Sequence, residues 1–357
     1  MKKRILVKVG TNVLSRKNRR LDYNRISDLV DQICTLKEEY QIILVSSGAQ
    51  GAGLEFFEFQ NEPDPLIRKQ MLASVGQARL FQVYFDFFRE QSVTPAQALI
   101  TRNDFNSKIS FQNIKTTLEG LLDNGIVPII NENDVVSLRE SSFGDNDQLA
   151  ALTAGMMRVD LLVILSDIEG FFTADPKTNP DAELIRNVDQ ISPELLSLCE
   201  DSLSTGGTGG MYSKLKAAQL ATEYGIPTIV TSGLTDQGLI KAVKGKTSGT
   251  HFHASKRKEK SDHGNWMLTG ASVQGTITID DGAQKALIEN KSLLAVGICN
   301  VEGPFEKKEV VLIQNKSRIR VGVGLTNFAS SEIQELIRPK IKPQGVVVIH
   351  KSHLYTL

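Results

Sequence analysis

The stretch ILVKVGT, residues 5–11, indicates the fold class of this chain. Its Ile, Leu and Val residues predict a strand over Arg4–Val9 that is buried on both faces, as in a parallel sheet covered by helices. Lys8 interrupts this apolar run, and a buried ammonium group needs an anionic partner to offset its lost hydration. Gly10 and Thr11 follow, and glycine lets the backbone approach a ligand closely. We therefore expect Lys8 to face a phosphate group.

Short apolar runs alternate with helical patterns through the first 250 residues. The predicted strands are Arg4–Val9, Gln41–Val45, Pro95–Ile100, Ile126–Ile130, Leu161–Leu165 and Thr228–Thr231. The predicted helices are Asn24–Glu39, Ile67–Glu90, Gln112–Leu122, Asp147–Met157 and Tyr212–Tyr224. Strands and helices in alternation predict an α/β fold with a mostly parallel sheet sandwiched by helices.

The composition changes after Gly249. Residues His251–His263 are polar, charged and without periodicity, which indicates a linker between domains. Strand patterns dominate the rest of the chain, with two short helical patterns between them. We therefore predict a catalytic domain over residues 1–250, a linker over 251–270 and a small β-rich domain over 271–357.

Composition argues against several classes of protein, although it does not exclude a local patch that binds nucleic acid. The 357 residues carry 41 Lys and Arg against 41 Asp and Glu, so no overall positive field favours nucleic acid. No apolar run approaches the roughly 18 residues of a membrane span, and the apolar run after Met1–Arg4 stops at Lys8, unlike a signal peptide. The three cysteines are far apart and odd in number, so we expect reduced thiols in a cytoplasmic protein.

Three polar clusters directly follow predicted strands, and a fourth precedes a predicted helix. They are Ser46-Ser47-Gly48, Asn131-Glu132-Asn133-Asp134, Gly144-Asp145-Asn146-Asp147 and Ser166-Asp167. Each has an ordinary alternative as a turn or a helix N-cap. Ligands of open parallel sheets, however, bind at the carboxyl ends of the strands. We therefore expect the clusters to form one binding site.

A glycine-rich loop, Gly206–Gly210, leads into a helical pattern that carries Lys214 in its first turn. Backbone N–H groups at a helix N-terminus, together with a lysine, suit a phosphate group, although a plain flexible loop is the alternative. The chain lacks the GxxxxGK[ST] motif of P-loop enzymes, and no GxGxxG motif follows a predicted strand. The sequence thus predicts a phosphate-binding site of another kind.

Six motifs together resemble the amino acid kinase family. They are VKVGTNVL at 7–14, VSSGA at 45–49, INEND at 130–134, GDND at 144–147, SDIEGFFTADP at 166–176 and GTGGMYSK at 207–214. The resemblance is closest to members that phosphorylate the side-chain carboxylate of free glutamate. The tail after about residue 271 resembles the PUA domain that follows the kinase domain in many of them.

The resemblance implies a role for each matched residue. Lys8 and Lys214 would neutralise the transferring phosphoryl group, and Asp147 would hold these lysines. Ser47, Asp134 and Asn146 match positions that contact glutamate. The ATP-binding positions would be Lys8, Ser166, Asp167, Thr208, Gly209, Gly210, Met211, Tyr212, Ser213 and Lys214. Three residues depart from the family pattern: Ser166 replaces a usual Thr, Phe172 a Tyr, and Gln50 an aliphatic residue.

The resemblance also implies the reaction and the partners. ATP would phosphorylate the γ-carboxylate of L-glutamate to L-glutamyl 5-phosphate, the first step of proline biosynthesis. Mg²⁺ would be carried mainly by the nucleotide, without assigned protein ligands. The chain would assemble as a homo-oligomer, a dimer or tetramer, and would be inhibited by proline.

Alternatives remain at the level of the sequence. The acceptor within this fold could be N-acetylglutamate, aspartate, carbamate or a nucleotide, although Asp134 favours an acceptor with a free ammonium group. RNA binding by the C-terminal domain is an alternative of another class. Residues 271–357 carry 11 Lys and Arg against 8 Asp and Glu, a net charge of about +3 that does not decide the question.

Overall fold

The computed structural model describes residues 2–56, 59, 63–137, 146–174, 179, 181–192, 195–196, 210–246, 249–254, 266–267, 273–338 and 344–356. The chain divides into two compact units. The first comprises Met1–Asp104 and Gln112–Arg257, and the second comprises Phe105–Phe111 and Lys258–Leu357.

The first unit is built on an eight-stranded sheet of order β3-β4-β2-β1-β5-β7-β8-β6. The pairs from β3 to β7 are parallel, whereas β8 runs antiparallel to β7. Its strands are β1 (Lys3–Val9), β2 (Tyr40–Ser46), β3 (Pro95–Ile100), β4 (Val127–Glu132), β5 (Leu161–Ser166), β6 (Asn187–Val188), β7 (Thr228–Ser232) and β8 (Thr250–Phe252). The mostly parallel sheet expected from the sequence is confirmed, and the six strands predicted in this region end within two residues of their observed bounds.

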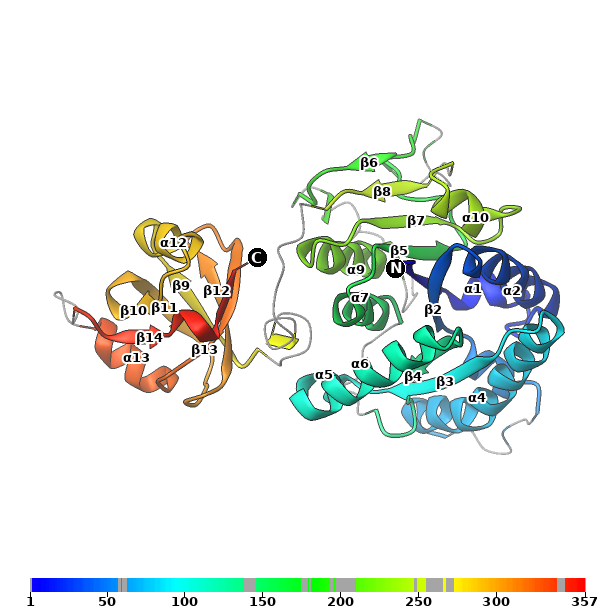
Figure 1. The fold of residues 1–357 in the computed structure, drawn as a ribbon, viewed down its shortest axis with the longest axis horizontal. Coiled ribbons are helices and arrows are strands. Elements are labelled where there is room, and N and C mark those ends of the chain that lie inside the picture. Colours follow the sequence, from blue (N-terminus) through cyan, green and yellow to red (C-terminus); the bar gives the residue numbers. More distant parts are fainter. Residues whose placement is uncertain are drawn as a thin grey trace. The chain divides into compact units, whose positions relative to one another are not determined.

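Helices cover both faces of this sheet, with α2 and α4 on one side and α7 and α9 on the other (Figure 1). The helices of the described residues up to β8 are α1 (Thr11–Leu14), α2 (Tyr23–Lys37), α3 (Ala49–Gly53), α4 (Pro65–Glu90), α5 (Arg102–Asn106), α6 (Lys108–Asp123), α7 (Asn146–Met157), α9 (Met211–Glu223) and α10 (Gly238–Val243). The sequence does not predict the four- and five-residue helices α1, α3 and α5, because segments so short show no helical periodicity.

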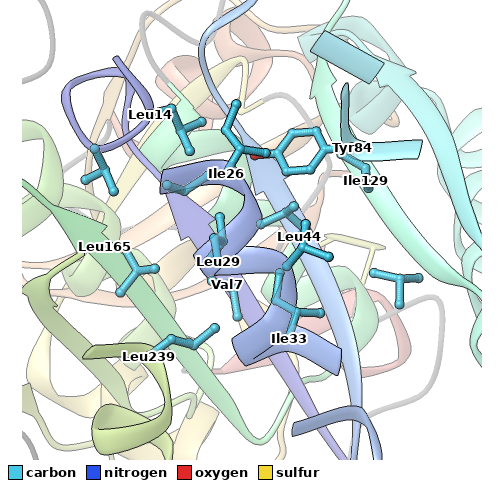
Figure 2. Packing of buried hydrophobic residues seen from close by; sticks show 14 of the residues in the cluster. Val7, Leu14, Ile26, Leu29, Ile33, Leu44, Tyr84, Ile129, Leu165 and Leu239 are labelled. Carbon is cyan, nitrogen blue, oxygen red and sulfur yellow. The ribbon is translucent and has the colours of Figure 1, made fainter. Parts of the chain in front are cut away.

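The core beneath α2 explains where Lys8 points. Val7, Leu44 and Leu165 of neighbouring strands pack against Ile26, Leu29 and Ile33 of α2 (Figure 2). Successive side chains of a strand point to opposite faces, so Lys8 lies on the face opposite Val7 and Val9. That opposite face of the sheet is covered by α7. The alternation therefore directs the Lys8 ammonium group toward α7.

The chain leaves this sheet later than the composition suggests. His251 and Phe252, inside the predicted linker, belong to β8, which pairs with β7 and β6. Phe252 is buried and its ring lies edge-on to Phe171, with centroids 5.3 Å apart. The buried Thr250 hydroxyl oxygen accepts a hydrogen bond from the backbone N–H of Phe171 at 2.8 Å. The three residues Thr250–Phe252 give no strand pattern in the sequence, since a single apolar residue shows no period.

The second unit contains a five-stranded sheet of order β11-β9-β12-β13-β15 and a two-stranded sheet of β10 and β14. Its strands are β9 (Gly275–Ile279), β10 (Leu293–Leu294), β11 (Ile298–Glu302), β12 (Val310–Asn315), β13 (Arg320–Leu325), β14 (Val347–Ile349) and β15 (Leu354–Thr356). In the described part of this unit lie the helices α12 (Asp281–Ile288) and α13 (Ser330–Ile337) and the 3₁₀ turns Ala295–Gly297 and Lys351–His353. Ile277, Ile313 and Ile333 are buried in one apolar core, as the predicted β-rich domain requires.

A smaller apolar cluster in the same unit involves the residues next to the predicted linker. Met267 is buried with Val310 and Val323, and Trp266 packs against this cluster. The indole N–H of Trp266 donates a hydrogen bond to the carbonyl oxygen of Phe105 at 3.1 Å. This bond helps explain why Phe105–Phe111 groups with the C-terminal residues and not with the first unit.

Cys34 and Cys299 are unpaired, whereas Cys199 lies outside the described residues. Burial, followed by the charge of Asp31, raises the pKa of the Cys34 thiol to about 11. Of the helices that the structure describes, none is both long and apolar enough to cross a membrane.

Candidate active site

The strand ends of the first sheet bring the predicted polar clusters to one edge. In the parallel register Lys8 lies beside Val45 and Ile164, and Val9 lies beside Ser46 and Leu165. The backbone N–H of Ser47 bonds to the carbonyl of Val9, and that of Gly10 bonds to the carbonyl of Leu165. The ends of β1, β2 and β5 therefore lie side by side, as expected for a ligand site of an open parallel sheet.

Asp147 lies at the centre of this edge, in the first turn of α7. One carboxylate oxygen pairs with the Lys8 ammonium group, and the other lies 3.2 Å from Lys214 Nζ. Ser213 also donates a hydrogen bond to Asp147 at 3.4 Å. The side chains of Lys8, Asp147 and Lys214 are only 5%, 0% and 8% exposed. The structure thus gathers two cations around one carboxylate inside the protein.

The charges in this cluster are coupled. Burial alone would raise the pKa of the Asp147 carboxyl, but the ammonium groups of Lys8 and Lys214 outweigh burial and hold that pKa below its ordinary value. Asp147 is therefore a carboxylate at neutral pH. A removed partner would leave a buried charge uncompensated, which is costly. The three residues consequently hold one another in place and leave a net positive charge at the edge of the sheet.

Asn146, the residue before Asp147, ties the start of α7 to the strand ends. Its Nδ2 lies 3.1 Å from the Ser46 carbonyl oxygen, 3.0 Å from Ser47 Oγ and 2.9 Å from Asn131 Oδ1. Asn131, at the end of β4, is buried. The structure thus brings together Ser47 and Asn146, two of the residues predicted to contact the substrate.

Asp134 has a partner that the sequence did not predict. Its carboxylate lies 3.0 Å from Lys69 Nζ of α4, and the two side chains are 11% and 34% exposed. The neighbouring Gln70 donates a hydrogen bond to the carbonyl of Val135 at 3.3 Å. A cavity of about 240 Å³ beside this pair is lined by Ala73, Ser74, Gln77, Ala78, Gln97, Leu99, Glu132, Asn133, Asp134 and Val135.

The residues predicted to bind nucleotide lie at the ends of β5 and the start of α9. Ser166 ends β5, and Asp167 accepts a hydrogen bond from Asn12 Nδ2 at 2.9 Å. Burial would raise the pKa of Asp167, but the hydrogen bond from Asn12, with smaller contributions from others, lowers it. Gly210 is the N-cap of α9, whose first residues are Met211, Tyr212, Ser213 and Lys214. Thr208 and Gly209 lie outside the described residues.

Three further residues contact the predicted site. They are Asn12, bonded to Asp167, Lys69, paired with Asp134, and Gln77, bonded to Asn131. Asn12 lies within the quoted motif at 7–14, four residues after Lys8, and this position was a signal that could have been used. Lys69 and Gln77 lie on a long amphipathic helix, where a polar residue carries no distinguishing pattern. In the part of the chain that the structure describes, no three acidic, histidine or cysteine residues group as metal ligands.

Comparison with known proteins assigns the family. The model described as the amino acid kinase family matches residues 3–232, and the PUA domain model matches residues 275–350. The chain is a member of the amino acid kinase family. Its relatives include glutamate 5-kinase of Dehalococcoides mccartyi, 39% identical over 99% of this chain and 98% of that protein. Glutamate 5-kinase 1 of Bacillus subtilis is 38% identical over 94% of this chain and 92% of that protein.

Solved structures agree with the family at the level of the fold. Carbamate kinase from Giardia lamblia bound to AMP-PNP has a TM-score of 0.51 and 17% identity, covering 71% of this chain and 99% of that chain. Isopentenyl phosphate kinase has a TM-score of 0.51 and 18% identity, covering 70% of this chain and 99% of that chain. The eight-stranded sheet is therefore the amino acid kinase fold, and the β-rich tail is a PUA domain.

Proposed function

We propose that this chain transfers the γ-phosphoryl group of ATP to the γ-carboxylate of L-glutamate. The product is L-glutamyl 5-phosphate, which makes the reaction the first step of proline biosynthesis. The observation that carries the proposal is the buried cluster of Lys8, Asp147 and Lys214 at the carboxyl edge of the sheet. Relatives that match nearly the whole chain are named glutamate 5-kinase, which supports the choice of acceptor.

The chemistry needs positive charge more than it needs a base. The side-chain carboxyl of glutamate has a pKa near 4.3, so it is already ionised at neutral pH. A carboxylate oxygen attacks the γ-phosphorus, the new O–P bond forms, and the bond to the β,γ-bridging oxygen breaks to release ADP. Lys8 and Lys214 offset the negative charge that nucleophile and phosphate bring together. Asp147, with both oxygens facing lysines, orients these cations.

The nucleotide would lie over the ends of β1 and β5 and the start of α9. In this proposal Lys8, Ser166, Asp167 and the segment from Thr208 to Lys214 contact ATP. The positive N-terminal end of α9 and the Lys214 ammonium group suit the phosphates. Mg²⁺ would bind chiefly to phosphate oxygens of the nucleotide and to water.

The acceptor would lie next to Ser47, Asn146 and Asp134. The Asp134 carboxylate would take the substrate ammonium group, and this requires the ammonium group to share or replace Lys69 as its partner. N-acetylation would remove that charge, so the proposal favours free glutamate over N-acetylglutamate. Loss of one partner from a desolvated ion pair commonly costs about 2–5 kcal/mol.

Three further properties belong to the proposal. We expect the chain to act in the cytoplasm, where its substrates are abundant, to assemble as a homo-oligomer and to be inhibited by proline. These expectations rest on the resemblance to glutamate-phosphorylating relatives. Size-exclusion chromatography with light scattering and a proline titration of activity test the last two directly.

ADP release over a panel of acceptors tests the proposed function. The panel contains glutamate, N-acetylglutamate, aspartate, carbamate and a nucleoside monophosphate, each with ATP and Mg²⁺. The proposal predicts the highest kcat/KM for glutamate. Faster release with any other acceptor, or no glutamate-dependent ADP, contradicts it.

A further inference from the structure

A chain of three side-chain amides connects α4 to the start of α7. Asn131 Nδ2 donates a hydrogen bond to Gln77 Oε1 at 2.7 Å, and Asn131 Oδ1 accepts one from Asn146 Nδ2 at 2.9 Å. Two backbone groups fix the direction of these bonds. The N–H of Glu132 donates to Asn131 Oδ1 at 2.9 Å, and the carbonyl oxygen of Ser46 accepts from Asn146 Nδ2 at 3.1 Å.

The direction of the bonds determines which atom Asn146 presents to a ligand. The two hydrogens of its Nδ2 are taken up by the Ser46 carbonyl, Ser47 Oγ and Asn131 Oδ1. Rotation of the amide by 180° would set its oxygen against two acceptors, which is unfavourable. Among the described residues, none donates a hydrogen bond to Asn146 Oδ1. That oxygen therefore remains as an acceptor for a donor on the substrate.

Gln77 stabilises this arrangement from the other end. Asn131 is 4% exposed, so its Nδ2 needs a partner inside the protein. Gln77 Oε1 supplies that partner. Without it the Asn131 amide would hold an unsatisfied buried donor and would gain from leaving its present rotamer. Asn146 would then lose the acceptor that holds its Nδ2 toward β4.

We propose that Gln77 is a positioning residue for the acceptor substrate, acting through Asn131 to keep Asn146 Oδ1 turned toward the substrate's ammonium group. Gln77 itself lines the 240 Å³ cavity beside Asp134 and acts on the reaction only through the two asparagines. Asp134 and Asn146 together then present two oxygen acceptors to an ammonium group. The proposal rests on glutamate being the acceptor.

We call the hydrogen-bonded chain from Gln77 through Asn131 to Asn146 the relay. Two substitutions at Gln77 test it. Gln77→Met keeps the length of the side chain and removes the acceptor, whereas Gln77→Glu keeps an acceptor oxygen. Loss of one hydrogen bond of ordinary strength predicts a rise of roughly 3- to 10-fold in the KM for glutamate of Gln77→Met. The KM for ATP stays unchanged, and Gln77→Glu retains the wild-type KM for glutamate. Gln82→Met, an exposed position on the same helix, is the matched control and leaves both constants unchanged.

A substrate analogue separates positioning from a general structural effect. Glutarate has both carboxylates of glutamate and lacks the ammonium group, so its competition with glutamate reports binding without that group. If the relay positions Asn146, Gln77→Met weakens the binding of glutamate and leaves the Ki of glutarate unchanged.

Several outcomes would overturn the relay. They are an equal loss for glutamate and glutarate, a Gln77→Met variant that behaves like Gln82→Met, or a Gln77→Glu variant as impaired as Gln77→Met. If glutarate binds too weakly for its Ki to be measured, the KM values of Gln77→Met and Gln77→Glu for glutamate are enough to test the relay. A wild-type protein without activity on glutamate would instead refute the proposed function, so the two failures are distinguishable.

Discussion

In the first unit the carboxyl edge of the sheet holds Lys8, Asp147 and Lys214 in the interior, whereas the PUA domain encloses an almost purely apolar core. Of the polar and charged residues found buried in the described chain, Thr326 alone belongs to the PUA domain. Burying charge is expensive unless the charge is paired, so a folded protein concentrates it where chemistry requires it. The difference supports the proposal that the first unit carries the reaction.

Removing the central carboxylate tests most severely whether the buried charges of the first unit depend on one another. Asp147→Asn leaves Lys8 and Lys214 without their shared anion, and we expect a loss of about 3–5 kcal/mol in the free energy of unfolding at pH 7. Chemical denaturation of the wild-type and variant proteins measures it. A comparable loss from Thr326→Val in the PUA domain would contradict the contrast between the units.

The same pair of proteins gives a pH dependence whose sign follows from the lowered pKa of Asp147. A depressed folded pKa stabilises the protein above the unfolded pKa, which is about 3.9 for aspartate. The stability advantage of the wild type over Asp147→Asn should therefore be constant above about pH 5 and shrink as the pH falls through the folded pKa. An advantage that grows on acidification would contradict the ion pairing.

Replacing each lysine separates catalysis from folding in the first unit. Lys8→Ala and Lys214→Ala should each lower kcat by about 10²- to 10³-fold, the usual loss when one preorganised charge donor is removed. Circular dichroism checks that the variants are folded, and Lys244→Ala, an exposed lysine paired with Glu39, is the control. Normal turnover in a folded Lys8 or Lys214 variant would refute the assigned roles.

Asp134→Asn tests whether glutamate and ATP bind to different residues at the carboxyl edge of the first sheet. Loss of the Asp134 charge should weaken glutamate binding by about 2–5 kcal/mol, because the substrate ammonium group loses its partner. The KM for ATP should not change, because Asp134 lies beside Lys69 and not beside Lys8 or Lys214. Steady-state kinetics with each substrate varied in turn measures this. A raised KM for ATP with an unchanged KM for glutamate would contradict the placement.

The smallest expected effect comes from removing the PUA domain. A chain that ends at Arg257 keeps every described residue of the site and should still phosphorylate glutamate. Its thermal stability should fall, because Phe105 loses the hydrogen bond from Trp266. Activity is measured as γ-hydroxamate, with Lys8→Ala in the same shortened chain as control. A shortened protein that is folded by circular dichroism but inactive would place the PUA domain within the catalytic machinery.

Much of this fold could be predicted because most strands of the first sheet are short apolar runs in the sequence. Runs such as Leu161–Leu165 need no tertiary information to be recognised as buried strands. The short strand β8 could not be predicted, since Phe252 owes its burial to Phe171, a partner distant in sequence. The end of the first unit was therefore placed too early by composition alone.

The arrangement of the candidate site could be predicted where its motifs lie at strand ends, and it could not be predicted where the helix α4 contributes. Lys8, Asn146, Asp147 and Lys214 were identified by their places next to strands or helix starts, and the structure brings Lys8, Asp147 and Lys214 into contact. Lys69 and Gln77 lie on α4, and their role depends on which face of that helix meets β4. Only the packing of α4 reveals that face.

Trapping the product with hydroxylamine tests both the proposed acceptor and the role of the buried lysines. Glutamate and N-acetylglutamate are supplied together at equal concentration with ATP and Mg²⁺, and the two γ-hydroxamates are separated by mass. We expect the hydroxamate of free glutamate to form faster, and Lys8→Ala and Lys214→Ala to nearly abolish its formation. Faster formation of the N-acetylglutamate hydroxamate, or equal formation by the lysine variants, would contradict the acceptor or the catalytic cluster respectively.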